Sequence, residues 1–429
     1  MHDVNQIVQK PDKYKYFLEI RNEDPQIIDQ IIRLNKHRKE LINQINNLRS
    51  QKNLISEKIG KKDYKTDNER QELILLSNEI DTQIKQLEPE LEVTQKKLNE
   101  ILVTIPNIVY EDVPVGKDSS ENVIVYSEGE EWIPDFEPLP HWELAEELNI
   151  IDFERGVKLS GSRFYIMKGK MAKLQRALIN FFIDFHVKYH NYKELYLPFI
   201  VKRHCLEGAG QLPKFEDNLY RDQEDDMWLV PTAEVPLTNI YKDEILSIEV
   251  LPLYYVAYTP CFRKEKIAAG RDVRGIKRGH QFDKVELYKF VTPESSDHEL
   301  EKLVQDACDI LRALELPFRV VKLCSGDLGF ASAKTYDIEV WAAGCKEWLE
   351  VSSCSNVLDF QARRANIRFR RTPTSKPEYV HTLNGSGLAL PRVVIAILEN
   401  YQQKDKSIKI PKVLQPYTGF ESIEISWKY

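Results

Sequence analysis

Three adjacent segments decide the fold of this chain: Pro260-Cys-Phe-Arg-Lys-Glu265, Gly270-Arg-Asp-Val-Arg-Gly275 and His280-Gln-Phe-Asp-Lys-Val-Glu286. They belong to two strand-like stretches, residues 254–263 and 281–291, which flank a loop rich in glycine and arginine. Because side chains alternate along a strand, Arg263 and Glu265 share one face. A guanidinium can bind a phosphate through two parallel hydrogen bonds, so the hairpin predicts a site for a polyphosphate or an RNA end. A solvated hairpin with surface ion pairs is the alternative.

A second polar cluster is Glu350-Val-Ser-Ser-Cys-Ser-Asn356. Glu339 and Glu350 lie on strand-like stretches on either side of a turn around Gly344. Carboxylates that converge near a phosphate site commonly hold Mg²⁺. Taken alone, this cluster is better explained as a polar strand edge.

Two further clusters are shorter. Asn384-Gly-Ser-Gly-Leu-Ala-Leu-Pro-Arg392 precedes a helical stretch, where glycines allow close backbone approach and Arg392 can face a phosphate. Thr232 and Glu234, two residues apart, could together bind an α-ammonium group. The alternatives are an ordinary glycine turn and a helix N-cap followed by an early acid.

Two heptad patterns occupy the first part of the chain, where apolar residues recur in alternating steps of three and four. The first series is Ile31, Leu34, Leu41, Ile45, Leu48, Ile55 and Ile59, and the second is Leu73, Ile80, Ile84, Leu87, Leu91, Leu98 and Ile101. A polar turn after Gly60 separates them, which predicts an antiparallel coiled-coil hairpin with arms about 50 Å long. Pro89 lacks an N–H and should kink the second arm locally.

The two arms differ in charge. Residues 25–60 contain seven basic and three acidic side chains, a balance of +4, whereas residues 61–100 contain seven basic and ten acidic ones, a balance of −3. The first arm is therefore the better candidate for meeting phosphates. Its candidate contacts are Arg33, Lys36, Arg38, Arg49, Lys52 and Lys58, of which Arg38 and Lys52 also interrupt the apolar series.

Composition restricts the class of protein. Hydrophobic residues make up 42% and charged residues 30%, an ordinary balance for a globular protein, and no apolar run approaches the roughly 20 residues needed to cross a bilayer. The N-terminus has neither a basic leader nor an apolar signal core, so a cytoplasmic location is expected. The six cysteines form no C-x-x-C pair, so their spacing predicts no zinc site. The net charge of −7 argues against indiscriminate binding to nucleic acid.

Together and in this order, the four clusters behind a coiled-coil hairpin resemble seryl-tRNA synthetases of the bacterial type over essentially the whole chain. Thr232-Ala-Glu234 is similar to the family's serine-binding segment. Class II motif 2 is similar to Arg263-Lys-Glu265 with the run that ends at Glu286, and motif 3 is similar to residues 384–392. Pro198 is similar to the motif 1 proline at the dimer interface. Two features depart from the family: Lys266-Ile267-Ala268 replaces a stretch of small residues in the motif 2 loop, and Pro89 lies within the second arm.

The resemblance implies an α+β fold with a tRNA-binding hairpin domain at 1–104, a linker at 105–120 and a class II catalytic domain at 121–429, whose mainly antiparallel sheet is flanked by helices. It implies a homodimeric serine–tRNA ligase. Serine and ATP, with Mg²⁺, would give seryl-adenylate and pyrophosphate, and the 3′ end of tRNA(Ser) would then accept the serine. Whether a selenocysteine tRNA is also charged is left open.

The same resemblance implies the site residues. It assigns catalysis to Arg263, Glu265 and Arg392; ATP binding to Arg263, Lys264, Glu265, Glu350, Val351, Ser352, Ser353 and Arg392; serine binding to Thr232, Ala233, Glu234, Glu286 and Ser386; and Mg²⁺ to Glu339, Glu350 and Ser353.

Three other functions remain to be weighed against this one. A related ligase that loads an amino acid onto a carrier protein would have little use for a long hairpin. A catalytically silent RNA-binding relative would not need Arg263, Glu265, Glu286 and Arg392, all of which are present. A coiled-coil interaction protein with an unrelated globular domain leaves the four ordered clusters unexplained.

Overall fold

The structure is a computed structural model that describes residues 1–266 and 274–424. It divides into two compact units, Met1–Ile105 and Pro106–Tyr429. Across the described residues, no helix combines the length and the apolar composition that crossing a membrane requires.

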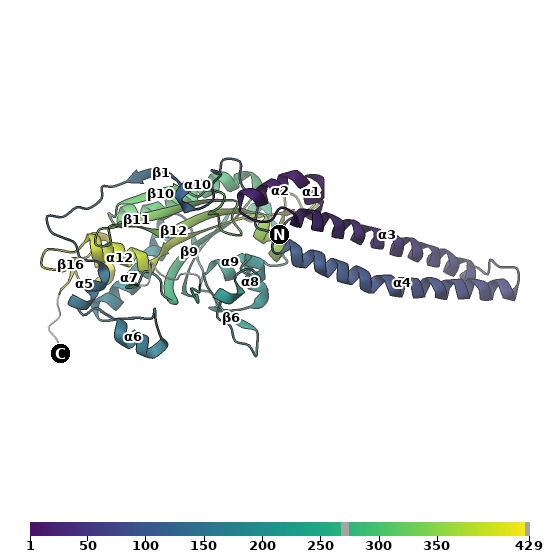
Figure 1. The fold of residues 1–429 in the computed structure, drawn as a ribbon, viewed down its shortest axis with the longest axis horizontal. Helices are drawn as coiled ribbons and strands as arrows, with labels where there is room; N and C mark the ends of the chain where they lie inside the picture. Colours follow the sequence, from purple (N-terminus) through teal and green to yellow (C-terminus); the bar gives the residue numbers. More distant parts are fainter. Residues whose placement is uncertain (267–273, 425–429) are drawn as a thin grey trace. The chain divides into compact units, whose positions relative to one another are not determined.

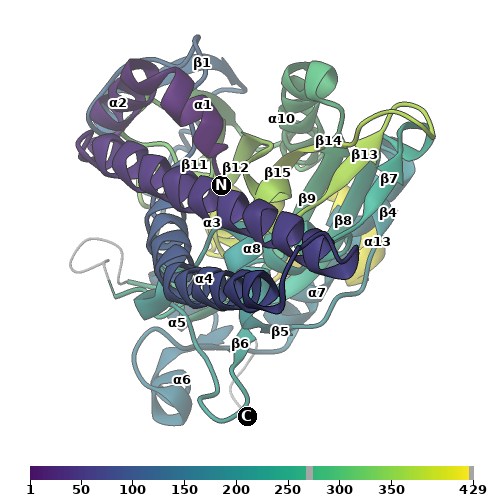
Figure 2. The ribbon, with the colours of Figure 1, turned by 90° about the vertical axis from the view of Figure 1, so that its right-hand side faces the viewer.

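The first unit is helical. Its elements are α1 (Val4–Gln9), α2 (Pro11–Ile20), α3 (Ile27–Gly60) and α4 (Asp67–Leu102). Figure 1 and Figure 2 both show α3 and α4 side by side along their length. Buried Ile45, Ile55, Ile80 and Ile84 form the seam, as the heptads predict, and the hairpin is confirmed. The helix α4 is continuous, with Pro89 in its interior.

Polar contacts join the two arms beside the apolar seam. Arg38 donates to Gln95 over 3.0 Å, Arg49 to Glu88 over 2.8 Å and Lys52 to Asp81 over 2.5 Å. Arg33, Lys36 and Lys58 are exposed on α3. Three of the six candidate RNA contacts therefore already serve the hairpin.

The second unit is built on an eight-stranded sheet, and its strand order is β1-β10-β11-β12-β15-β9-β8-β4. Its strands are β1 (Val123–Glu128), β10 (Phe318–Lys322), β11 (Lys334–Ala342), β12 (Glu347–Leu358), β15 (His381–Ala389), β9 (Gln281–Val291), β8 (Leu253–Phe262) and β4 (Lys193–Glu194). Among the described strands of this sheet, β4 and β8 are the one parallel pair. The mainly antiparallel sheet is thus confirmed, and β9 has the predicted bounds.

Helices and short ribbons surround the sheet. The helices are α5 (His141–Glu147), α6 (Phe153–Ser160), α7 (Lys170–Tyr189), α8 (Arg203–Ala209), α9 (Glu234–Asn239), α10 (Ser296–Ala313), α11 (Phe360–Ala365), α12 (Leu390–Asn400) and α13 (Gln415–Thr418). The short strands pair as β2 (Ile151–Asp152) with β3 (Ile166–Met167), β5 (Ile200–Lys202) with β6 (Met227–Leu229), β13 (Arg368–Arg370) with β7 (Ile245–Ser247) and β14 (Glu378–Tyr379), and β16 (Ile408–Lys409) with β17 (Ser422–Ile423).

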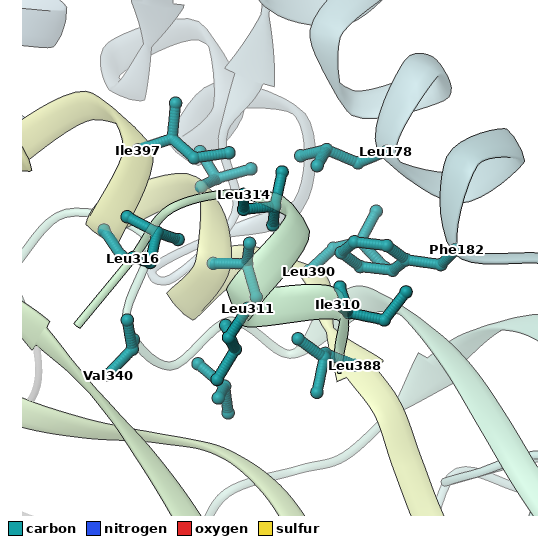
Figure 3. Close-up of a cluster of buried hydrophobic side chains, with 14 of the residues drawn as sticks. Leu178, Phe182, Ile310, Leu311, Leu314, Leu316, Val340, Leu388, Leu390 and Ile397 are labelled. Carbon is teal, nitrogen blue, oxygen red and sulfur yellow. The ribbon is translucent and has the colours of Figure 1, made fainter. Parts of the chain in front are cut away.

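Alternation sorts the side chains of the central strands between two faces. On one face Val285, Leu287 and Leu383 join α7, α10 and α12 in the largest apolar core. Figure 3 shows part of this core, where Phe182 of α7 lies beside Ile310 of α10. On the opposite face of β9, Tyr288 and Phe290 pack in a second core with α9 and α11. The middle of that second face stays open and holds the polar clusters.

The segment predicted as a linker is bound to the second unit. Asn107 is buried, and its side-chain amide donates to the carbonyls of Ala331 (2.9 Å) and Val357 (2.7 Å). Tyr110 donates its backbone N–H to Ala333 over 3.0 Å. From Pro106 onward the chain is therefore held against the strands that carry the site.

Candidate active site

A cavity of about 280 Å³ opens on the second face of the sheet, where β9, β12 and β15 lie side by side. Eight of the candidate site residues line it: Glu234, Arg263, Glu265, Glu286, Glu350, Ser353, Ser386 and Arg392. They come from segments up to about 160 positions apart in the chain, and only the sheet brings them together. A second cavity of about 290 Å³ shares Glu234, Arg263 and Asn384 with the first, and Thr232 lines it.

The cationic part of the cavity contains three arginines. Arg263 follows β8, donates through Nε to the carbonyl of Pro231 (3.2 Å) and has its guanidinium carbon 5.2 Å from the ring centre of Phe282. Arg278 donates to the Glu265 carboxylate over 3.3 Å. Arg392, at the start of α12, donates to the carbonyl of Glu350 over 2.6 Å and pairs with its carboxylate at 3.2 Å. Guanidinium groups placed around one cavity favour a polyphosphate ligand.

The acidic part of the cavity is enclosed more deeply. Glu286 is fully buried on β9, where it forms an ion pair with Lys284 and accepts from Thr232 Oγ1 over 3.2 Å. Its second oxygen, Oε1, is buried without a hydrogen-bond partner among the described residues. A buried acceptor left without a donor is costly, so this oxygen marks a place where a ligand donor fits.

Glu234 lies beside Glu286 at the start of α9 and lines both cavities. Burial and then the nearby Glu286 carboxylate raise the pKa of Glu234 to about 7, although Lys284, Gln361 and Arg263 oppose the shift. Two carboxylates so close together favour a cationic ligand, since a positive charge between them relieves their repulsion.

The oxygen ligands suited to a divalent cation lie at the edge of the same cavity. Glu350 and Ser353 of β12 both line it, and carboxylate and hydroxyl oxygens are donors that Mg²⁺ accepts. Asp337 faces Ser353 across the β11–β12 ladder, and burial together with Glu350 raises the pKa of Asp337 well above its usual range. A cation beside this group of carboxylates would relieve their repulsion, so these residues fit Mg²⁺.

Five of the predicted active-site residues, all of them in the described part of the chain, line neither cavity. Glu339 lies opposite Glu350 in the ladder and forms an ion pair with Arg319 at 2.5 Å. Lys264 lies with its ammonium 5.6 Å from the ring centre of Tyr220. Ser352 is buried and donates to the carbonyl of Ser386 over 2.6 Å, while Ala233 and Val351 are core residues. In the motif 2 loop segment that differs from the family, Lys266 is exposed, and Ile267 and Ala268 lie outside the described residues.

Several lining residues were given no role from the sequence. Phe282 and Lys284 share the strand parity of Glu286, and Asn384 shares that of Ser386, so alternation along β9 and β15 could have found them. Lys277 and Arg278 were visible only as members of a basic loop. Gln361, which contacts Glu234 from α11, gave no sequence signal at all.

Comparisons with known proteins agree with this geometry. Residues 214–401 match the family described as tRNA synthetase class II core domain (G, H, P, S and T), and residues 1–109 match the seryl-tRNA synthetase N-terminal domain. The chain is 55% identical over 419 residues to the serine–tRNA ligase of Chloroflexus aurantiacus, which covers 98% of both chains.

Two solved structures are similar over nearly the full length. One is the seryl-tRNA synthetase of Pyrococcus horikoshii complexed with ATP, with a TM-score of 0.95, 40% identity and 100% of both chains covered. The other is the cytoplasmic serine–tRNA ligase of Naegleria fowleri in complex with AMP, with a TM-score of 0.86, 30% identity, and 97% of this chain and 96% of that one covered. This chain belongs to the seryl-tRNA synthetase family of class II aminoacyl-tRNA synthetases.

Proposed function

We propose that this chain activates L-serine with ATP in the cavity on the second face of the sheet and then transfers the serine to tRNA(Ser). The proposal rests on one observation: a single cavity has a cationic end and an acidic end. One end has Arg263, Arg278 and Arg392, and the other has the buried Glu286, one oxygen of which has no hydrogen-bond partner in the described part of the chain. Membership in the family supports the same reaction.

The arginine end holds the nucleotide. Phe282 offers an aromatic face on which a purine can stack, with Arg263 nearby to meet the α-phosphate. Glu265 accepts from the adenine amino group, and Arg392 meets the γ-phosphate. As the serine carboxylate attacks, charge builds on the α-phosphate, and fixed guanidinium donors stabilise it without reorganising. Lys264, Val351 and Ser352 support the ATP side through the backbone around the cavity.

The acidic end holds serine. Glu234 and Thr232 bind the α-ammonium group, Ala233 joins them in one turn, and Glu286 and Ser386 meet the side-chain hydroxyl. An unpartnered carboxylate oxygen should discriminate strongly against alanine, because alanine would leave it buried and unsatisfied.

Mg²⁺ would be held by Glu350 and Ser353, with Glu339 as a further proposed ligand. Its chemistry would be to neutralise charge on the ATP phosphates. Before it binds, Arg392 neutralises the Glu350 carboxylate.

The transfer step needs the 3′ end of tRNA to reach the same point. The second cavity meets the first at Glu234, Arg263 and Asn384, and we assign the 3′ end to it. The hairpin at 1–104, followed by the linker at 105–120, would bind the tRNA body through Arg33, Lys36, Arg38, Arg49, Lys52 and Lys58. Charging of a selenocysteine tRNA stays a prediction, and the same charging assay with that tRNA tests it.

We also propose a cytoplasmic homodimer. Exposed apolar side chains precede and follow the motif 1 proline, Pro198, in the sequence: Tyr196 is 86% exposed, Tyr189 60% and Ile200 50%. A second copy would cover this surface. Light scattering of the purified protein tests the dimer, and fractionation of cells tests the location.

Amino-acid-dependent exchange of pyrophosphate into ATP tests the central proposal. Serine should support exchange and alanine should not. Glu286→Gln should weaken serine use by about 100-fold or more while ATP binding changes little. Glu249→Gln, an exposed acid that lines neither cavity, is the matched control. Exchange that is indifferent to serine, or a Glu286→Gln enzyme with normal serine kinetics, would refute the assignment.

A further inference from the structure

Gln361 is a fully buried glutamine on α11 that lines neither cavity. A buried primary amide has two N–H groups and one carbonyl oxygen to satisfy, so each partner matters. The contacts that Gln361 makes lead directly to the amino-acid end of the site.

Both sides of the amide are occupied. Nε2 donates to Glu234 Oε1 over 2.6 Å and to the carbonyl of Ala209 over 3.2 Å. Oε1 accepts from the Tyr288 hydroxyl over 2.8 Å and from Thr382 Oγ1 over 2.9 Å. Four elements, α8, α9, β9 and β15, therefore converge on one amide.

These partners fix which way the amide faces. If the amide were reversed, its oxygen would meet the Glu234 carboxylate and the Ala209 carbonyl, both of which are acceptors. The hydroxyls of Tyr288 and Thr382 hold the oxygen on the opposite side. Glu234 consequently receives an N–H donor from a group that cannot turn away.

The neutral charge of the donor matters as much as its position. Lys284, two residues before Glu286 on β9, already neutralises that carboxylate. A second cation against Glu234 would compete with an ammonium ligand for the same carboxylate. An amide N–H orients the carboxylate and favours its charged form while leaving the full negative charge for the ligand.

We propose that Gln361 is the positioning residue of the amino-acid site, holding the Glu234 carboxylate in place to receive the α-ammonium group of the substrate. The inference rests on the proposed serine-activating function. Gln361 touches no substrate and acts through Glu234.

The test compares two isosteric changes. Gln361→Met keeps the volume and removes the donor, and Gln402→Met makes the same change at a glutamine that is 2% exposed, bonds to Leu139 and Glu399, and lines neither cavity. Serine-dependent pyrophosphate exchange gives KM for serine and for ATP across pH. Thermal unfolding shows how far each variant is destabilised.

Gln361→Met should raise KM for serine by about 10- to 100-fold, since a hydrogen bond to a charged group is lost, and leave KM for ATP close to normal. Its serine pH profile should move to higher pH, because losing the amide donor raises the pKa of Glu234. The other charged neighbours of Glu234, which are Glu286, Lys284 and Arg263, stay in place. Tyr288→Phe, which removes one donor to Gln361, should shift both readouts in the same direction by less.

Gln402→Met should lower the unfolding temperature without a selective effect on serine. A folded Gln361→Met enzyme with the wild-type serine KM and pH profile would overturn the proposal and leave the serine function standing. The proposal also fails if serine and ATP suffer equally, as a purely structural role requires. Should Gln361→Met not fold, unchanged serine kinetics in Tyr288→Phe would refute it. A wild-type enzyme without serine-dependent exchange would remove the proposed function and this inference together.

Discussion

Glu350 and Ser353 are three residues apart on β12, yet both side chains line the same cavity. The ladder explains this spacing: Ile338 pairs with Ser352 while the next residue, Glu339, pairs with Glu350, which leaves Val351 as the extra residue of a β-bulge. Simple alternation would have grouped Glu350 with Ser352. The bulge instead turns Ser352 inward and Ser353 toward the cavity.

The bulge yields a prediction about metal dependence. Ser353→Ala and Glu350→Gln should each weaken Mg²⁺ or Mn²⁺ binding in the presence of ATP by about tenfold or more. Ser352→Ala is the matched control for metal binding, because its hydroxyl bonds to the Ser386 carbonyl and does not line the cavity, so metal affinity should stay close to normal even where the ATP side is weakened. Mn²⁺ titration by electron paramagnetic resonance measures the affinity. A metal affinity that falls in Ser352→Ala but not in Ser353→Ala would contradict the assignment.

Glu339→Gln decides whether Glu339 belongs to the metal set. Its carboxylate pairs with Arg319 and lies outside the cavity lining, so this change should alter metal affinity less than Glu350→Gln.

The raised pKa of Glu234 predicts the pH dependence of serine use. The carboxyl is neutral below its pKa of about 7 and charged above it, and only the charged form attracts the serine ammonium. The value of kcat/KM for serine should therefore rise about tenfold per pH unit below pH 7 and level off above it. Glu234→Gln should have low activity without this rise. An unchanged profile in that variant would assign the titration to another group.

The hairpin should separate the two steps of the reaction. Each unit has its own apolar core, so replacing residues 25–103 by a short linker should leave serine-dependent pyrophosphate exchange largely intact and cripple tRNA charging. Equal charging by the deleted and intact enzymes would refute an RNA role for the hairpin.

Charge reversals locate the RNA contacts on the hairpin. Lys36→Glu on exposed α3 should weaken tRNA binding and reduce the salt dependence by about one unit of slope for each lost phosphate contact. Lys85→Glu on α4, which is equally exposed, is the matched control for net charge. Measuring tRNA affinity at several salt concentrations distinguishes the two arms. Equal losses of affinity in both variants would show that the change in net charge, rather than a contact on α3, causes the effect.

A buried hydrogen bond between a histidine and a carboxylate should stabilise the second unit. His141 and Glu399 are fully buried, with Nδ1 2.8 Å from Oε1, and the His141 Nε2 accepts the N–H of Ile276 over 3.3 Å. Gly275 lies against the same ring at a φ of +69°, where a side chain would collide with it. The pair thus fixes the chain where it returns from the motif 2 loop.

His141→Ala should cost about 1.5–3 kcal/mol, because the Glu399 carboxylate loses the imidazole donor while it keeps the backbone donors of residues 141 and 345. Arg155→Ala, which breaks an exposed pair with Asp152, should change stability little. All six tryptophans lie beyond residue 106, so urea unfolding followed by tryptophan fluorescence reports on this unit. Equal midpoints for the two variants would show that the buried pair is not stabilising.

Much of the architecture could be predicted from the sequence because its determinants are local. Seven-residue spacing of apolar side chains is enough to specify two packed helices, and α3 and α4 form the predicted hairpin. Period-two patterning placed β9 at residues 281–291. The residues that we propose for the amino-acid and phosphate ends of the site could be named from the sequence because they lie within short motifs, such as Thr232 to Glu234.

Other features were decided only when distant strands paired. The bulge that brings Ser353 beside Glu350 depends on the register of β12 against β11, and nothing within residues 350–353 specifies that register. Gln361 reaches Glu234 because α11 packs behind α9, more than 120 positions away in the chain. The sequence by itself therefore determined which elements form and which chemical groups they carry. The tertiary structure decided which of those groups face one another, because hydrogen-bond register and packing are properties of pairs of segments.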